Sequence, residues 1–375
     1  MREVVVLGGG LHPFGRFPEK SFVDLTRPAI REALDDAGVP FQAVQIAYCG
    51  RVNAPMGTGL AVVNEFGLTG IPIVNVEQAC SSSSTAFRQA FWAIEQGLYD
   101  VALVVGFEKM ERGMIKMAAQ DSYGVQMGQS VAPAGYARKA QTYMHRHGAT
   151  PEMFAQISVK SHKNGSLNPN AQYQKPVTIE EVLASRMIAS PITLLQCSPT
   201  SDGASALVLA SAEQAHRYSS PDRWMTIAGW ASGTEAYEED PGEEGDLEPT
   251  VTRLSADLYE RAGIAPADID VVQVHDAFTP GEVFRLEAMG LVSEGEGARF
   301  VAEGGADIDG PVPVNTDGGL ISRGHPMGAT GAAQIVEILR QLRGEAGARQ
   351  VPGEPQVGVC HNSGVGGVNM HAFKK

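Results

Sequence analysis

The sequence predicts an α/β protein in which a mixed sheet is covered by helices on both faces. Two observations support this prediction. Segments with the apolar spacing of amphipathic helices alternate along the chain with short apolar runs that are typical of strands. The same order of helix, Ala-Gly stop, turn and apolar strand also occurs twice, once in each half of the chain. This repeat indicates two similar halves related by a pseudo-twofold axis.

In the first half, an amphipathic helix at residues 31–39 ends at Ala-Gly, the usual signal of a helix C-terminus. An apolar strand follows at residues 43–49. A β-rich run at residues 71–78 then precedes a second amphipathic helix at residues 85–97. A strand at residues 101–105 closes this half, and both helices and this strand have counterparts in the second half.

In the second half, the first helix and its following strand correspond to residues 256–264 and 269–274. The second helix and the closing strand correspond to residues 328–343 and 356–359. The helix at residue 328 is preceded by Gly324-His325-Pro326, at the place where Cys80 opens the helix of the first half. Two such halves would place the two helix N-termini opposite one another. We therefore expect Cys80 and His325 to lie near one centre, although they are far apart in the sequence.

The repeat divides the chain into an N-terminal half (residues 1–108 and 200–232), an inserted cover domain (residues 109–199) and a C-terminal half (residues 250–375). The insertion is rich in Met and Tyr, which suit either a cover over an apolar ligand or a lid packed on the body. These residues are Met110, Met114, Met117, Met127, Tyr136, Tyr143, Met144 and Met153. The acidic stretch at residues 235–248 is expected to be a solvated connector.

The composition argues against several functional classes. With 375 residues, 43% of them hydrophobic, the chain can bury a large core. A net charge of −14, without a dense Lys/Arg block, argues against nucleic-acid binding. The four cysteines form no CxxC pair, which favours a reducing cytoplasm. We expect no membrane span, because no apolar stretch is long enough, and no signal peptide, because the chain enters a strand directly.

Cys80 carries the strongest chemical signal in the chain. It lies where the β-rich run breaks into Ala79-Cys80 and four serines, immediately before a helix. Unsatisfied backbone N–H groups and the positive end of the helix dipole favour a thiolate over a thiol. We therefore expect a lowered pKa and a nucleophilic sulfur. The alternative is that Cys80 is a small buried hydrophobic residue, as most lone cysteines are.

Three motifs in the second half favour the chemical interpretation. They are His-Asp-Ala-Phe at residues 275–278, the Gly-rich segment at residues 318–328, and Cys-His-Asn-Ser-Gly-Val-Gly-Gly at residues 360–367. A thiolate that attacks a thioester or ketone needs a base, which His325 would supply to Cys80. The oxygen that becomes negative needs N–H donors already in place. The backbone of Cys80, the imidazole of His275 and the segment after Asn362 are the candidates.

Together these motifs resemble the thiolase superfamily and, within it, the sterol-carrier-protein type. Patterns at residues 168–171 and 201–210 extend the likeness over nearly the whole chain. The resemblance implies a five-layered αβαβα fold of two similar halves, usually dimeric, that binds coenzyme A thioesters. It also implies that Cys80 is the acyl-accepting nucleophile and that His325 activates it.

The same resemblance implies that His275 takes the place of an asparagine that holds a water in the oxyanion hole of other thiolases. It also implies that His361-Asn362 takes the place of a second cysteine, which shuttles protons in other thiolases. One departure matters: the sterol-carrier-protein type usually has His-Asp-Cys-Phe, and residue 277 is alanine here, which cannot move a proton. Cys360, His361 or His275 would take over that role, or the reaction needs no second thiol. The residues expected around the oxyanion and the substrate are Asn362, Ser363, Gly364, Gly324 and Phe278.

The sequence thus predicts a thiolase that cleaves a 3-oxoacyl-CoA with coenzyme A through an acyl-Cys80 intermediate, as a cytoplasmic homodimer without a metal or a permanently bound cofactor. One alternative is a retro-aldolase or acetyl-CoA condensing enzyme of the thiolase-like class that works with an OB-fold/zinc-ribbon partner. Another is a catalytically silent subunit that binds acyl-CoA. A dinucleotide site at residues 4–10 is disfavoured, because Pro13 stands where the third glycine of G-x-G-x-x-G belongs.

Overall fold

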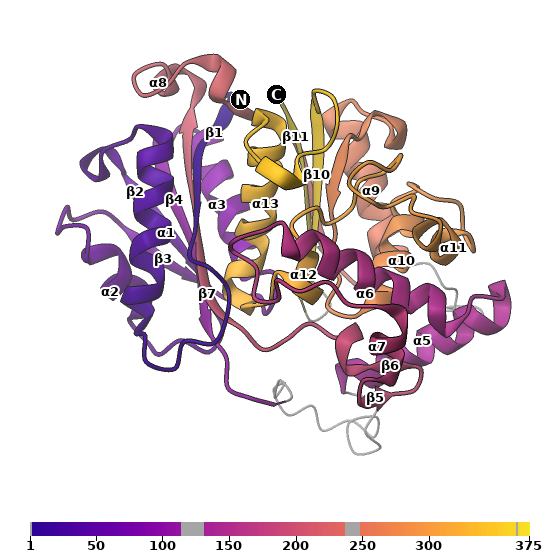
Figure 1. Ribbon diagram of the computed structural model, residues 1–375. Coiled ribbons are helices and arrows are strands. Elements are labelled where there is room, and N and C mark those ends of the chain that lie inside the picture. The colour runs from indigo at the N-terminus through magenta and orange to yellow at the C-terminus, as the bar shows by residue number, and fades with distance from the viewer. Residues whose placement is uncertain (1, 114–130, 237–247, 365–366) are drawn as a thin grey trace.

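The computed structural model describes residues 2–113, 131–236, 248–364 and 367–375 (Figure 1). Within these residues it has a nine-stranded mixed sheet in the order β3-β2-β4-β7-β1-β8-β11-β10-β9 and a separate pair, β5-β6. Helices pack on both faces of the large sheet, as Figure 1 shows, so the predicted mixed α/β fold is confirmed.

The first half contains β1 (Val4–Leu11), α1 (Phe22–Ala37), β2 (Ile46–Gly50), α2 (Thr58–Asn64), β3 (Ile73–Val76), α3 (Ser82–Glu95), β4 (Val101–Lys109) and β7 (Asp202–Ser211). The inserted segment contains α5 (Ala132–His147), α6 (Pro151–Ser166), α7 (Ile179–Ala184), β5 (Met187–Ala189) and β6 (Ile192–Thr193). The remainder contains α8 (Ala212–Ala215), β8 (Met225–Thr234), α9 (Pro249–Ala262), β9 (Val271–Gln273), α10 (Thr279–Ala288), α11 (Gly297–Ala302), α12 (Gly319–Ser322), α13 (Met327–Arg343), β10 (Val357–Gly364) and β11 (Gly367–Lys374).

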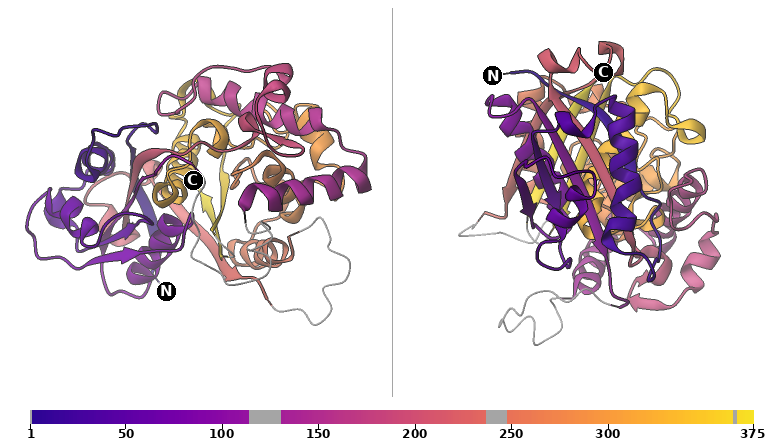
Figure 2. Two further views of the ribbon diagram at one scale, coloured as in Figure 1. Left: turned by 90° about the horizontal axis from the view of Figure 1, so that it is seen from below. Right: turned by 90° about the vertical axis from the view of Figure 1, so that its left-hand side faces the viewer.

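Three hydrophobic cores lie one behind another and produce five layers. Alternation along β4 shows the principle: Ala102 and Val104 face a central core around α3 and α13, whereas Leu103 and Val105 face an outer core with α1. A second outer core lies between the strands of the other half and the helices α9 and α10. The layers are therefore helix, sheet, the pair α3 and α13, sheet and helix (Figures 1 and 2).

Helix α13 lies at the centre of the molecule. It contacts β4 and β7 of the first half, β10 of the second half and α3 beside it. Apart from Arg340 and Arg343 at its end, all its residues are buried, as expected for a helix that is enclosed on every side. Gly331 permits the close approach to α3, because a Cβ at this position would lie 2.7 Å from the backbone nitrogen of Ser84.

Strands β8 and β11, which lie near the junction between the two halves of the sheet, were not predicted from the sequence. β8 hydrogen-bonds along its length to β11, and it meets β1 only through the pairs Val5–Thr226 and Val6–Met225. Few hydrogen bonds therefore join the two halves of the sheet. Their connection depends mainly on the central core that both halves share.

The inserted segment packs against the second half, where α6 contacts α10, α11 and α12 (Figures 1 and 2). Tyr143 is buried in the core of that half, and Met144 and Met153 pack against it. The predicted cover residues Met114, Met117 and Met127 lie outside the described residues, as does most of the acidic stretch. The described part of the insertion thus favours the interpretation as a lid packed on the body.

The substitution Gly331→Ala tests the close contact between α13 and α3. In an exposed helix this change stabilises by about 0.5–1 kcal/mol. Here the new methyl group would meet the Ser84 backbone, so we expect the free energy of unfolding to fall by about 1–3 kcal/mol. The matched control is Gly135→Ala in α5, where no described atom lies within 4 Å of the new methyl group. Urea unfolding measures both variants, and equal effects would contradict the packing.

Candidate active site

Cys80 lies on a strained turn between β3 and α3. The preceding Ala79 has a φ of +45°, in the left-handed region that alanine rarely adopts, so the surrounding contacts must hold it there. Gly364 supplies one such contact, since a Cβ at that position would lie 2.6 Å from the backbone nitrogen of Cys80. The turn directs the sulfur of Cys80 toward the second half of the molecule.

The thiol of Cys80, at the start of α3, meets the imidazole of His325, which directly precedes α13. Nε2 of His325 lies 3.2 Å from Sγ of Cys80, which confirms the prediction that the two helix starts bring these residues together. Cys80 is partly exposed and His325 is buried. The residue that carries the thiol thus keeps part of its surface exposed, whereas the imidazole that contacts it is buried.

The hydrogen bonds of His325 decide which of its nitrogens faces the sulfur as an acceptor. Thr330 Oγ1 lies 3.0 Å from the carbonyl oxygen of Pro326 and 2.7 Å from Nδ1 of His325. A hydroxyl has one hydrogen, which it donates to the carbonyl, so it accepts a bond from Nδ1–H. Nε2 is then unprotonated and can accept the proton of the Cys80 thiol. The backbone N–H of His325 donates to Ser201 Oγ (2.9 Å), which fixes the loop.

His275 is the second imidazole of the site. One ring nitrogen of His275, one of His325 and the sulfur of Cys80 lie within 4.8 Å of one another. The two rings meet edge-on, with their centroids 5.1 Å apart. Nδ1 of His275 is 3.2 Å from Nδ2 of Asn362. The backbone N–H of His275 donates to Nδ1 of His361 (3.4 Å). The structure therefore brings together these five predicted site residues.

Burial keeps the central pair uncharged. Cys80 retains only part of its exposure, and the loss of water around it raises the pKa of its thiol to about 12, with the Glu108 carboxylate adding to the rise. Burial also lowers the pKa of His325 to about 3, and Arg323 lowers it further. The expectation of a lowered pKa for Cys80 is wrong for this substrate-free site, because desolvation outweighs the helix N-terminus.

Cys360 is not brought into the cluster. It is buried in the central core among the apolar side chains that pack around α13, and this burial raises the pKa of its thiol well above the ordinary value. Among the described residues, its side chain makes no hydrogen bond to Cys80 or His325. A role of Cys360 in moving protons at the sulfur of Cys80 is therefore poorly supported by the geometry.

Three further predicted site residues are Gly324, which precedes His325, Ser363, which follows Asn362, and Phe278, which contacts the inserted segment. Gly324 has a φ of +110°, and a Cβ at this position would lie 2.9 Å from Ser201 Oγ, so glycine is required directly before His325. Ser363 is partly buried in β10, opposite Val368 of β11. The ring of Phe278 lies 4.9 Å from the ring of Tyr136, which comes from the inserted segment.

Several residues of this site were not predicted from the sequence. Thr330 lies two residues beyond the Gly-rich segment and five residues after His325, and its position at the start of a helix was the only signal of a link to that imidazole. Tyr136 appeared only as one of many Met and Tyr residues of the insertion. Arg285 was also missed: it is buried in α10, and its guanidinium donates to the Tyr136 hydroxyl (2.8 Å).

Two family models match the chain. The model described as "Thiolase, N-terminal domain" covers residues 4–213, and "Thiolase C-terminal domain-like" covers residues 221–373. Among the described residues, no helix combines the length and the apolar character that crossing a membrane requires.

Several curated proteins are similar over nearly the whole chain. An acetyl-CoA acetyltransferase of Methanothermobacter thermautotrophicus is 38% identical, with 100% of both chains covered. Sterol carrier protein 2 of Bos taurus is 38% identical over 97% of this chain and 70% of its own length. The benzoylsuccinyl-CoA thiolase subunit BbsB of Thauera aromatica is 38% identical, with 97% of this chain and 95% of the subunit covered. Among solved structures, the Ltp2-ChsH2(DUF35) aldolase matches with a TM-score of 0.85 and 26% identity, over 99% of this chain and 97% of the other.

The charge state of the resting site can be tested by ultraviolet absorbance at about 240 nm, where a thiolate absorbs and a thiol does not. Because the pKa of Cys80 is raised to about 12, its proton should be lost only in strong alkali. The absorbance difference between the wild type and Cys80→Ala should therefore stay flat between about pH 5 and pH 9. A step in this difference with a midpoint below about pH 7 would show a thiolate–imidazolium pair instead.

Proposed function

The chain belongs to the thiolase family of acyltransferases, and from this premise we propose that it cleaves a 3-oxoacyl-CoA with coenzyme A through an acyl-Cys80 intermediate. The observation that carries the proposal is the 3.2 Å contact between Sγ of Cys80 and the unprotonated Nε2 of His325. A thiol that is neutral at rest becomes a nucleophile when its proton moves to such a base. The similarity to a benzoylsuccinyl-CoA thiolase subunit supports a 3-oxoacyl-CoA substrate.

In the first proposed step, Sγ of Cys80 bonds to the 3-oxo carbon, and the thiol proton passes to Nε2 of His325. The carbonyl oxygen gains the negative charge, which His275 and backbone N–H groups would stabilise. Collapse of this alkoxide breaks the C2–C3 bond, leaving an acyl thioester on Cys80 and an enolate on the departing coenzyme A thioester.

The same imidazole can complete the proton balance. The proton that His325 accepted from Cys80 is available for the enolate carbon, and the freed Nε2 can then take the proton of the incoming coenzyme A thiol. Attack of that thiol releases the acyl group as acyl-CoA, and the proton returns to Cys80. This sequence needs no second thiol, which agrees with Ala277 and with the burial of Cys360 in the central core.

Cys80→Ser is the direct test of the covalent step. A hydroxyl of much higher pKa is a far weaker nucleophile, so we expect thiolysis of 3-oxoacyl-CoA substrates to fall by about 10³-fold or more. Incubation of the wild type with a 3-oxoacyl-CoA should add the mass of one acyl group to the peptide that contains Cys80, as measured by mass spectrometry. Cys360→Ser is the matched control, and it should keep most of the activity.

Retained thiolysis in Cys80→Ser, or an acyl group on another residue, would contradict the covalent mechanism. A second candidate is a retro-aldolase acting on a β-hydroxyacyl-CoA. The similarity to the Ltp2-ChsH2(DUF35) aldolase and the alanine at position 277 favour it, and it would bring an OB-fold/zinc-ribbon partner. Such an aldolase needs no thiol nucleophile, so Cys80→Ala would remain active in it and inactive in a thiolase.

We further propose that the protein is a homodimer, joined beside β3. Among the described strands β3 is at the edge of the sheet and pairs only with β2, so one side of it is open to another strand. Large apolar side chains are exposed on β3 and around α2: Val74, Met56, Leu60 and Leu68. A second copy would cover this surface.

Sedimentation velocity should therefore find a dimer for the wild type at about micromolar concentration. The paired substitutions Leu60→Glu and Leu68→Glu, which place charge in the surface, should shift the protein toward monomers. The exposed Met187 lies on the insertion, away from this surface, and Met187→Glu should leave the dimer intact. A monomeric wild type would contradict the proposal.

A further inference from the structure

A chain of buried amides leads from the backbone of β10 to the imidazole of His275. Gln334 of α13, which is fully buried, has its Nε2 3.3 Å from the carbonyl oxygen of His361. Its Oε1 lies 3.0 Å from Nδ2 of Asn362. The same Nδ2 lies 3.2 Å from Nδ1 of His275. No step of the proposed reaction uses Gln334.

The direction of every bond in this chain follows from its fixed end. A backbone carbonyl can only accept, so the nitrogen of the Gln334 amide must face the oxygen of His361. Oε1 of Gln334 therefore faces Asn362, and the group that Asn362 turns toward it must be the donor, Nδ2. This amide also faces Nδ1 of His275, so Nδ1 accepts a hydrogen bond.

A neutral imidazole carries one hydrogen. Burial lowers the pKa of His275 well below its ordinary value, so this side chain is neutral, and its hydrogen must then be on Nε2. His325 and His275 thus differ at Nε2, which is unprotonated in His325 and protonated in His275. The first can accept the thiol proton, and the second can donate a hydrogen bond to an oxygen that becomes negative.

The other neighbour of Asn362 does not select this orientation. Ser84 Oγ lies 2.9 Å from Oδ1 of Asn362 and 2.9 Å from the carbonyl oxygen of Ser81. Its one hydrogen can go to either oxygen, so Ser84 can donate to Asn362, or donate to Ser81 and accept from an amide nitrogen of Asn362. With Gln334 removed, the Asn362 amide could turn over and accept from His275 Nδ1–H, and Ser84 would still be satisfied. The choice between the two tautomers therefore depends on Gln334.

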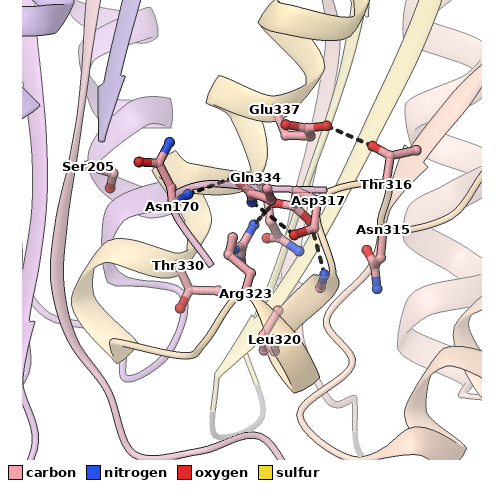
Figure 3. Close-up of polar contacts among 12 residues, drawn as sticks. Asn170, Ser205, Asn315, Thr316, Asp317, Leu320, Arg323, Thr330, Gln334 and Glu337 are labelled. Carbon is pink, nitrogen blue, oxygen red and sulfur yellow. Dashed lines mark hydrogen bonds and ion pairs between the residues drawn. The ribbon is translucent and has the colours of Figure 1, made fainter. Parts of the chain in front are cut away.

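Gln334 lies one helical turn after Thr330, on the same face of α13 (Figure 3). Thr330 accepts from Nδ1–H of His325, and Gln334 acts on His275 through Asn362. A single helix face thus orients both imidazoles. We propose that Gln334 is a positioning residue, which orients the Asn362 amide and so holds His275 as the Nε2–H tautomer that donates to the oxyanion of the reaction.

The tautomer can be measured without substrate, by ¹⁵N NMR of protein labelled at histidine. Protonated and unprotonated ring nitrogens differ strongly in shift and coupling, and His275→Phe identifies the signals of residue 275 among the nine histidines. In the wild type we expect Nε2 protonated and Nδ1 unprotonated. In Gln334→Leu we expect a measurable population of the Nδ1–H form. An Nδ1–H wild type, or a Gln334→Leu spectrum identical to that of the wild type, would overturn the proposal.

Gln341→Leu is the matched control, because Gln341 is an equally buried amide of α13 whose partners, Thr316, Glu337 and the Arg349 carbonyl, lie outside the site. It should cost comparable stability and leave the tautomer of His275 unchanged. Gln334→Glu keeps an oxygen that accepts from Asn362, so it should retain the Nε2–H form. If Gln334→Leu does not fold, loss of the Nε2–H form in Gln334→Glu would overturn the proposal, and its retention would support it.

The catalytic part of this inference rests on the proposed thiolysis. Gln334→Leu should lower kcat for 3-oxoacyl-CoA thiolysis by about ten- to a hundredfold, with KM changed by less than about threefold, because the lost donor acts on the charged intermediate. Gln334→Glu should restore most of kcat. A shifted tautomer with unchanged kcat would overturn the positioning role. A wild type without thiolysis on 3-oxoacyl-CoA substrates would instead contradict the proposed function, and the tautomer measurement would stand.

Discussion

Helix α13 is packed against both halves of the molecule, and the geometry of the site depends on this packing. Its residues face a sheet on each side, and Gly331 brings its backbone against Ser84 of α3. Thr330, in the first turn of α13, contacts the ring of His325, and Gln334 contacts Asn362, which in turn contacts His275. Close packing of α13 in the core therefore also fixes the positions of the two imidazoles. The core and the site are thus parts of one packed unit.

Burial then determines the electrostatics. Charges taken out of water are costly, so the thiol and the imidazole that contacts it remain neutral at rest, with pKa values of about 12 and about 3. Charge separation would appear only as a bond to substrate forms, when an oxyanion and an imidazolium develop together within a few ångströms. In a site of this kind, hydrogen-bond donors that are already oriented contribute more than they would in water.

The loop that carries His325 is held from outside the central core as well. Within this loop, Arg323 forms a buried ion pair with Asp317 (Figure 3). The backbone N–H groups of Gln172 and Tyr173 donate to the carbonyl oxygens of Arg323 and Ser322. Residues 172 and 173 belong to the insertion, which therefore supports the loop that carries the imidazole as well as packing on the second half. The order of strands and helices along the chain does not predict these hydrogen bonds between the insertion and the loop before α13.

The sequence by itself determined the order of elements, the duplication and the identity of the reactive side chains. Local patterns suffice for these, because Ala-Gly stops, apolar periodicity and motifs such as Gly324-His325-Pro326 concern near neighbours in the chain. The contact of Cys80 with His325 followed from the duplication. Only the tertiary structure decided the pKa of Cys80, the exclusion of Cys360 from the cluster and the link from Gln334 to His275. Each of these depends on desolvation or on hydrogen bonds between segments far apart in the chain, which local spacing does not encode.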